Sequence, residues 1–218
     1  MKKINFNTTA AFDVDAQRGF TPLCPEELPV LGGHLIVDEC LKNHTKAKYK
    51  VMSKDAHPCA GAWTATEANP QYSNVGLPNV DIRWNSHCVV GTNGFELLKG
   101  LPHPSEYNFI IYKGAEYDMH PYSPCYHDLA KTISTGVIEW AKINGIDTFI
   151  LGGLALNFEE SPLCLGSAAI DLKDAGFEVI VNLAATRGIG SDEGRNIFID
   201  ILKAKDIIIV DSADEITF

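Results

Sequence analysis

One cysteine of the sequence stands where a nucleophile could form. Cys164 follows Ser161-Pro162 and precedes a helical pattern, so we predict Ser161 as the helix N-cap and Pro162 at the first helical position. Cys164 would then lie in the first turn, where backbone N–H groups and the helix dipole favour a thiolate and could stabilise an oxyanion. A lone cysteine is more often a small buried hydrophobic residue. Its position makes Cys164 a candidate for nucleophilic catalysis.

Two charged residues directly follow apolar runs that we predict to be strands. Asp15 follows the run 9–14, and Lys113 follows the run 109–112. Because the carboxyl ends of parallel strands meet at one edge of a sheet, we expect both side chains to lie near Cys164. There a carboxylate can transfer protons and an ammonium can stabilise a thiolate. Taken singly, the aspartate could form a turn and the lysine could be a solvated charge.

A second chemistry is indicated where another predicted strand ends. Asp55-Ala56-His57 offers a carboxylate and an imidazole two residues apart, and His87 in a later irregular segment could supply a third ligand. Such a set leaves positions open on a divalent ion such as Zn, Fe or Mn, and the sequence does not choose among these metals. The remaining histidines are interpreted as surface or loop residues: His34, His44, His103, His120 and His127.

The elements that must position these residues alternate along the chain. Short runs that are apolar on every residue are typical of parallel strands buried on both faces. Such runs occupy residues 9–14, 49–52, 109–112, 149–151, 179–181 and 207–210. Segments of helical length lie at 34–46, 127–142, 163–174 and 193–203. This alternation predicts a three-layer α/β/α sandwich around a six-stranded, mostly parallel, Rossmann-like sheet.

Length and composition indicate one domain. A chain of 218 residues, 45% of them hydrophobic, can build its own core, so we predict a single domain over residues 1–218. Within it, residues 56–108 form a long insertion with little periodicity, rich in Gly, Pro, Asn and Trp. Irregular segments of this length in a compact domain are usually functional.

Charge and cysteine content restrict the partners and the location. The 18 basic and 28 acidic residues give a net charge of −10, which argues against a nucleic-acid partner. No segment approaches the ~20 apolar residues that span a bilayer, so we expect no membrane partner. Six cysteines without a C-x-x-C pair indicate a reducing compartment, and we expect a cytoplasmic protein with a small-molecule substrate. Homo-oligomer formation is left open.

Three separated motifs resemble the isochorismatase-like cysteine hydrolase superfamily. Residues 12–20 (FDVDAQRGF) resemble its opening D-x-Q-x-x-F, with Asp15 in the place of the catalytic aspartate. Lys113-Gly114, with Tyr122-Ser123 downstream, resembles its K-G segment. Residues 164–177 resemble its cysteine helix, with Cys164 as the nucleophile. The motifs occur in the family's order along nearly the whole chain, and the resemblance implies an isochorismatase-like hydrolase domain with an Asp, Lys and Cys catalytic set.

Two further segments resemble the nicotinamidases (pyrazinamidases) within this superfamily. Residues 53–58 (SKDAHP) and 84–92 (WNSHCVVGT) match their S-x-D-x-H-P and W-x-x-H-C-V-x-G-T patterns. The resemblance implies conversion of nicotinamide to nicotinate and ammonia through a thioester, a step of NAD salvage. It also implies that a metal held by Asp55, His57 and His87 takes the pyridine nitrogen. The residues implied in substrate binding are Phe20, Trp84, Tyr122 and Ala155, the last through an oxyanion hole next to a cis peptide bond.

The chain departs from the family pattern in two places. The family often has a further histidine a few residues after His57, where this chain has Gly61-Ala62-Trp63. The connection from Gly153-Leu154-Ala155 to Cys164 is also several residues longer, through residues 156–163, which include Glu159 and Glu160. The second oxyanion donor, the role of the extra residues and the substrate range beyond nicotinamide therefore stay open.

Three alternatives are compatible with parts of the pattern. The first is another hydrolase of the superfamily acting on a different small amide or ether, with the metal ligands as a vestige. The second is a non-enzymatic α/β domain that binds a small molecule at the same strand ends. The third is a non-haem iron oxygenase, which the parallel-strand pattern argues against and which leaves Cys164 and Lys113 without roles.

Overall fold

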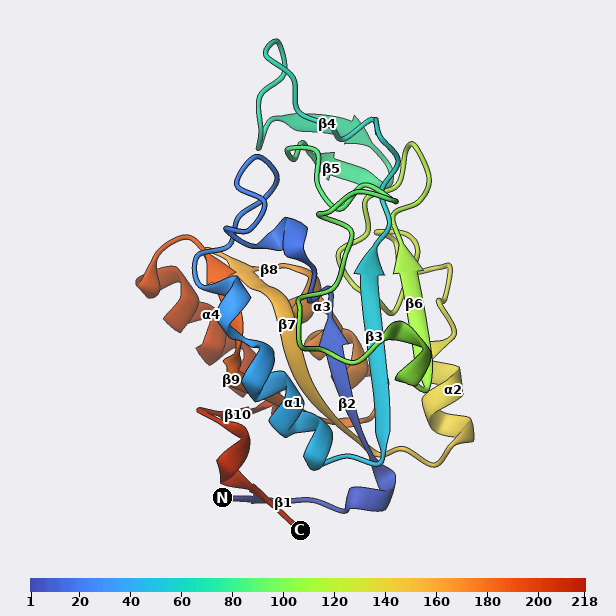
Figure 1. Cartoon of the computed structure of the whole chain (residues 1–218), viewed down its shortest axis with the longest axis vertical. Coiled ribbons are helices and arrows are strands. Elements are labelled where there is room, and N and C mark those ends of the chain that lie inside the picture. Colours follow the sequence, from blue (N-terminus) through green and yellow to red (C-terminus); the bar gives the residue numbers. More distant parts are fainter.

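A parallel six-stranded sheet in the order β10-β9-β7-β2-β3-β6 forms the centre of the protein, described over residues 1–218 by a computed structural model (Figure 1). The predicted sheet is thereby confirmed, and a seventh, two-residue strand pairs antiparallel with β7. The strands are β2 (Thr9–Val14), β3 (Tyr49–Asp55), β6 (Phe109–Lys113), β7 (Thr148–Phe158), β8 (Ser161–Pro162), β9 (Glu178–Ile189) and β10 (Ile208–Val210). β7 and β9 extend well beyond the apolar runs that predicted them.

Helices cover both faces of this sheet. They are α1 (Val37–Thr45), α2 (Val137–Ile143), α3 (Cys164–Asp174) and α4 (Asp192–Ala204). The main core cluster packs residues of α2, α3 and α4 against one face, including Phe12 and Phe149 of the strands. α1 contacts β2, β7 and β9, and in Figure 1 it lies in front of the sheet while α3 lies behind it. Strand residues alternate between the two sides, and since both sides are covered, most positions of the central strands are buried and apolar.

The strand order reverses next to β2. The chain passes from β2 to the neighbouring β3 and on to β6, then returns to pair β7 with the other side of β2. Ligands of open α/β sheets bind at such a switch point, outside the carboxyl ends of the strands. The residues that follow β2, β3, β6 and β7 are therefore the ones expected to form a site.

Two helix predictions differ from the structure. The helix predicted over 127–142 begins only at residue 137, because the Asp128 carboxylate accepts hydrogen bonds from the backbone N–H groups of Thr132 and Ile133 and closes a turn instead. Ser161 is not the N-cap of α3: it lies in β8, and α3 begins at Cys164 without a side-chain cap. Cys164 is nevertheless in the first helical turn, as predicted.

The long insertion carries little regular structure. It contains one hairpin, β4 (Asn74–Leu77) and β5 (Val80–Ile82), whose strands pair only with each other and which projects beyond the strand tips in Figure 1. The chain termini meet at the opposite end, where β1 (Lys2–Lys3) pairs with β11 (Ile216–Thr217). None of the helices combines the length and the apolar character that crossing a membrane requires.

Gly153 allows β7 to approach β2 directly beneath the site. Its φ is +118°, and a Cβ there would lie 1.9 Å from the carbonyl oxygen of Val14. We predict that Gly153→Ala lowers the free energy of unfolding by about 3 kcal/mol or more, because backbone strain and a backbone clash add. Gly145→Ala is the control, since Gly145 has φ +67° but open space around its Cβ position. The free energy of unfolding of the Gly145→Ala control should fall by only about 1–2 kcal/mol, because backbone strain acts there without a clash. If urea unfolding shows that both variants lose the same free energy of unfolding, the predicted clash at Gly153 is wrong.

Candidate active site

Four reactive side chains meet at the carboxyl ends of neighbouring strands. Asp15 directly follows β2, with a left-handed φ of 43° that turns the chain out of the sheet. Asp55 and Lys113 are the last residues of β3 and β6, and Cys164 begins α3. All four are buried. The structure thus brings together the three residues predicted for catalysis and one predicted for the metal.

Lys113 lies at the centre of this group. Its ammonium contacts the Asp55 carboxylate and lies 3.1 Å from Oδ2 of Asp15. It lies 3.6 Å from Sγ of Cys164 and donates a hydrogen bond to the carbonyl oxygen of Pro121 at 3.1 Å. A single cation therefore contacts the candidate nucleophile and both carboxylates.

The orientation of Asp15 is fixed by a neighbouring strand. The Ser53 hydroxyl donates to Oδ1 of Asp15 at 2.6 Å, and the backbone N–H of Asp15 donates to the carbonyl of Ser53 at 3.2 Å. Oδ2 is buried and lies 3.1 Å from the Lys113 ammonium. The acidic oxygens of Asp15 and Asp55 and the sulfur of Cys164 lie within 4.8 Å of one another. A carboxylate oxygen of Asp15 is thus close enough to the thiol of Cys164 to exchange a proton with it.

Burial governs the protonation of these groups. It raises the pKa of the Cys164 thiol well above its ordinary value, and Lys113 opposes this rise only in part. The resting group is therefore a thiol, against the expectation of a thiolate from the helix start. Burial likewise raises the pKa of Asp15 despite the nearby Lys113. Burial alone would lower the pKa of Lys113, but Asp15 and Asp55 hold it well above its usual range, so the lysine stays charged.

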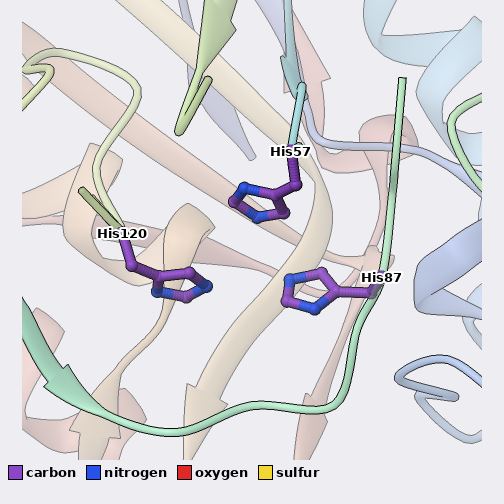
Figure 2. A group of neighbouring side chains, drawn as sticks. All are labelled: His57, His87 and His120. Atoms are coloured by element: carbon purple, nitrogen blue, oxygen red, sulfur yellow. The ribbon is translucent and has the colours of Figure 1, made fainter. Parts of the chain in front are cut away.

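Three imidazole rings lie beside this group. Figure 2 shows His57, His87 and His120 turned toward one another from separate segments. One nitrogen from each lies within 4.8 Å of the others, and the His57 and His120 rings stack at a centroid distance of 5.1 Å. All three are buried. The predicted ligands His57 and His87 are brought together with Asp55, whose Oδ2 lies 3.5 Å from Nε2 of His57 and 3.8 Å from Nε2 of His87.

The hydrogen bonds of these histidines leave lone pairs facing inward. Nδ1 of His57 lies 2.8 Å from the carbonyl oxygen of Gly114, and Nδ1 of His87 lies 2.6 Å from that of Asn85. A carbonyl only accepts, so Nδ1 carries a proton in both rings, and in the neutral form of each ring the lone pair is on Nε2. Burial, assisted by His57, lowers the pKa of His87 to about 3, which keeps its ring neutral.

These lone pairs fit a divalent cation. Nε2 of His57 and both ring nitrogens of His120 are buried without a hydrogen-bond partner. Two imidazole lone pairs and a carboxylate oxygen that face one another in a buried space repel unless a cation lies between them. Imidazole and carboxylate are ligands of Zn, Fe and Mn. The side chains present are thus chemically suited to holding such an ion.

His120 is the member of this cluster that the sequence interpretation missed. The sequence predicts a surface or loop residue, and His120 does lie in a loop, but only 4% of it is exposed. His44, for which the sequence gives the same prediction, is also buried: it lies near the end of α1, with Nε2 2.7 Å from Oδ2 of Asp13 in β2. The lack of a further histidine soon after His57 was the one signal that could have prompted a search for a ligand elsewhere.

The predicted substrate-binding residues line one small cavity at this site. Its volume is about 20 Å³, and it touches Cys164, Asp55, His87 and His120. Phe20, Trp84, Tyr122 and Ala155 form other parts of its wall. The peptide bond between Leu154 and Ala155 is cis, and Ala155 falls in a gap of the pairing between β7 and β9. The aromatic and backbone groups named from the sequence thus surround the candidate nucleophile.

The extra residues before Cys164 form an extension of β7. β7 runs on to Phe158, turns at Glu159 and Glu160, and returns as β8, which pairs back on Asn157 and Phe158. The Glu159 carboxylate accepts hydrogen bonds from the backbone and hydroxyl of Ser191 before α4. Its negative charge is therefore directed to the N-terminus of α4 and not to the sulfur of Cys164.

Comparisons with known proteins agree with this arrangement. No family model matches the chain. A nicotinamidase from Acinetobacter baylyi is 31% identical over 186 residues, which cover 84% of this chain and 83% of that protein. Among solved structures, a nicotinamidase/pyrazinamidase from Acinetobacter baumannii has a TM-score of 0.82 at 24% identity, covering 95% of this chain and 98% of that one.

A pyrazinamidase from Pyrococcus horikoshii, solved in complex with zinc, has a TM-score of 0.70 at 26% identity, covering 93% of this chain and 98% of that one. The structural matches share the parallel sheet and its helices, and the sequence match extends over most of both chains. The chain therefore belongs to the nicotinamidase family.

Proposed function

We propose that the protein hydrolyses nicotinamide to nicotinate and ammonia, as a cytoplasmic step of NAD salvage, with residues 1–218 acting as one hydrolase domain. The observation that carries this proposal is the Lys113 ammonium, which contacts the Cys164 thiol and the Asp15 and Asp55 carboxylates beside a cluster of histidines. Family membership supports the substrate, and six free cysteines support a reducing compartment.

The first half-reaction forms a thioester. Asp15 takes the thiol proton of Cys164 as the sulfur attacks the amide carbon, and Lys113 stabilises the negative charge that develops. Asp15 then passes this proton to the departing nitrogen, so the C–N bond breaks and ammonia leaves. The backbone N–H groups of Ala155 and Cys164 are the proposed donors to the oxyanion, since one lies in a gap of the ladder and the other begins a helix.

The second half-reaction restores the enzyme. Asp15 removes a proton from water as the water oxygen attacks the thioester carbon, and the C–S bond breaks to give nicotinate. The proton held by Asp15 returns to the sulfur of Cys164, and the second proton of the water is released to solvent as the product ionises, so atoms and charge balance over the cycle. Lys113 remains charged throughout, because the two carboxylates that surround it hold its pKa high.

Asp55, His57 and His87 are the proposed metal ligands, and His120 joins them. When bound, the metal supplies a Lewis-acid position for the pyridine nitrogen of the substrate. Phe20, Trp84 and Tyr122 would pack around the ring and hold the carboxamide over Cys164. A hydrolase of another small amide or ether would have no use for this cluster of lone pairs, so the cluster favours a pyridine-containing substrate over that alternative.

We predict that Cys164→Ala lowers ammonia release from nicotinamide by roughly 10⁴-fold or more, because the attacking sulfur is lost. The protein should keep its metal, since Cys164 contacts Lys113 and not the histidines. Cys40→Ala is the matched control: Cys40 is equally buried, but it lies in α1. Appreciable turnover by the Cys164 variant would exclude the sulfur as the nucleophile.

Removal of the metal should weaken substrate binding more than turnover, because the proposed role of the ion is orientation. We predict that chelation raises the KM for nicotinamide and that adding back Zn, Fe or Mn restores it. His87→Ala should abolish metal binding as measured by elemental analysis, whereas His44→Gln should not, because His44 is buried elsewhere against Asp13. A full metal complement in the His87 variant would remove this residue from the ligand set.

His120→Gln tests the additional ligand. Changes at groups that only support metal ligands cost 10–100-fold in affinity, so loss of a direct ligand should raise the metal Kd by about 100-fold or more. The visible absorption spectrum of the cobalt-substituted protein should also change, because it reports the coordination number directly. An unaltered spectrum and Kd would show that His120 is part of the pocket wall and not of the metal sphere.

A further inference from the structure

Two cavities lie on either side of one wall. The cavity beside Cys164 has a volume of about 20 Å³, and a larger one of about 400 Å³ lies next to it. Trp84, Tyr122 and Leu163 line both cavities and so form the wall between them. Exposed residues such as Asp81 and Pro162 line the larger cavity, which therefore opens to solvent.

The inner cavity is too small for the proposed substrate. A cavity needs roughly 10–15 Å³ to hold one water molecule, so the inner cavity has room for about one water and none for an aromatic amide. Some part of its lining must move before a pyridine ring can reach the sulfur. Asp55 and Cys164 belong to a strand and a helix of the sheet layers. Phe20, His87 and His120, which also line the cavity, pack against one another in the histidine cluster, so we assign the movement to the wall.

Tyr122 is the least constrained part of that wall. Trp84 is held by backbone hydrogen bonds with Trp63 and Ala65, and its ring packs against Tyr72 at a centroid distance of 5.4 Å. Leu163 donates its backbone N–H to the carbonyl of Leu156. Tyr122 itself makes no backbone–backbone hydrogen bond, so the position of its ring depends on the contacts that its side chain makes.

The Tyr122 hydroxyl is held by one carboxylate. It lies 2.9 Å and 3.0 Å from the two carboxylate oxygens of Asp81, to which it donates, and it accepts a hydrogen bond from Nε1 of Trp84 at 3.3 Å. Asp81 is exposed and lies on β5, whose only strand partner is β4. The hairpin that carries this carboxylate thus has no ladder hydrogen bonds to the main sheet, as its position in Figure 1 illustrates.

We propose that Asp81 is a positioning residue that latches Tyr122 in the closed wall, and that substrate and product pass between the two cavities when this hydrogen bond opens. The inference rests on the proposed hydrolysis of a pyridine carboxamide. Asp81 touches no reacting atom and acts through Tyr122. The larger cavity would hold the substrate before it enters, and the closed wall would retain the substrate beside Cys164 during the reaction.

Binding kinetics of nicotinate to the metal-loaded enzyme test the latch, with tryptophan fluorescence as the signal because Trp84 is in the wall. A hydrogen bond to an exposed carboxylate is strong enough that its loss should raise both the association and dissociation rate constants by roughly threefold to tenfold in Asp81→Ala. The Kd should change less than either rate constant.

Two further variants separate the hydrogen bond from charge and from folding. Asp81→Asn loses the negative charge but keeps an acceptor, so its rate constants should stay near those of the wild type. Tyr122→Phe keeps the charge and the hairpin but loses the donor, so it should match Asp81→Ala. The double variant Asp81→Ala/Tyr122→Phe should be no faster than either single variant.

The outcomes distinguish the latch from the proposed function. If nicotinate binds but Asp81→Asn is as fast as Asp81→Ala, the effect is electrostatic steering and the latch is overturned. Unchanged rate constants in Asp81→Ala and Tyr122→Phe overturn it as well, while leaving the proposed hydrolysis intact. If the wild-type enzyme does not bind nicotinate at all, the proposed function itself fails and the latch fails with it.

Discussion

The buried ammonium of Lys113 is the interaction on which the site depends. An isolated charge in a protein interior is costly, so this side chain can stay charged only while the Asp15 and Asp55 carboxylates face it. The same ammonium contacts Cys164, where negative charge develops during attack. Asp55 offers one oxygen to Lys113 and turns the other toward His57 and His87. Lys113 and the candidate histidine ligands therefore contact the same Asp55 carboxylate and are electrostatically coupled.

Much of this arrangement could be predicted, because it follows from a rule of sheet geometry. Strands covered on both faces are mostly apolar, so the central strands are visible as short, predominantly apolar runs. The residue after each run then lies at a common edge. That rule alone predicts that Asp15, Lys113 and Asp55 lie at one edge of the sheet, and the structure shows them there. The predicted helix start places Cys164 in the same group, although Ser161 is not the N-cap of α3.

The remaining parts of the site depend on long-range contacts that leave no local pattern. His120 becomes buried only because its loop folds over His57, and a lone histidine beside proline reads as a surface residue. The turn around Asp128 forms because one carboxylate captures N–H groups that a helix would have used, and helical periodicity does not record that competition. The pairing of Asp81 with Tyr122 joins residues on a hairpin and a distant loop.

The extension of β7 has a consequence for how this family can vary. Phe158, Ser161 and Pro162 of the extension line the larger cavity, while Glu159 anchors the turn to Ser191. The groups that react belong to the strand tips and to α3, so the rim and the reacting atoms are built from different pieces of chain. A longer or shorter extension would change the depth of the larger cavity without displacing the sulfur of Cys164. Selectivity for bulky amides can thus evolve through the length of one hairpin, independently of the chemistry.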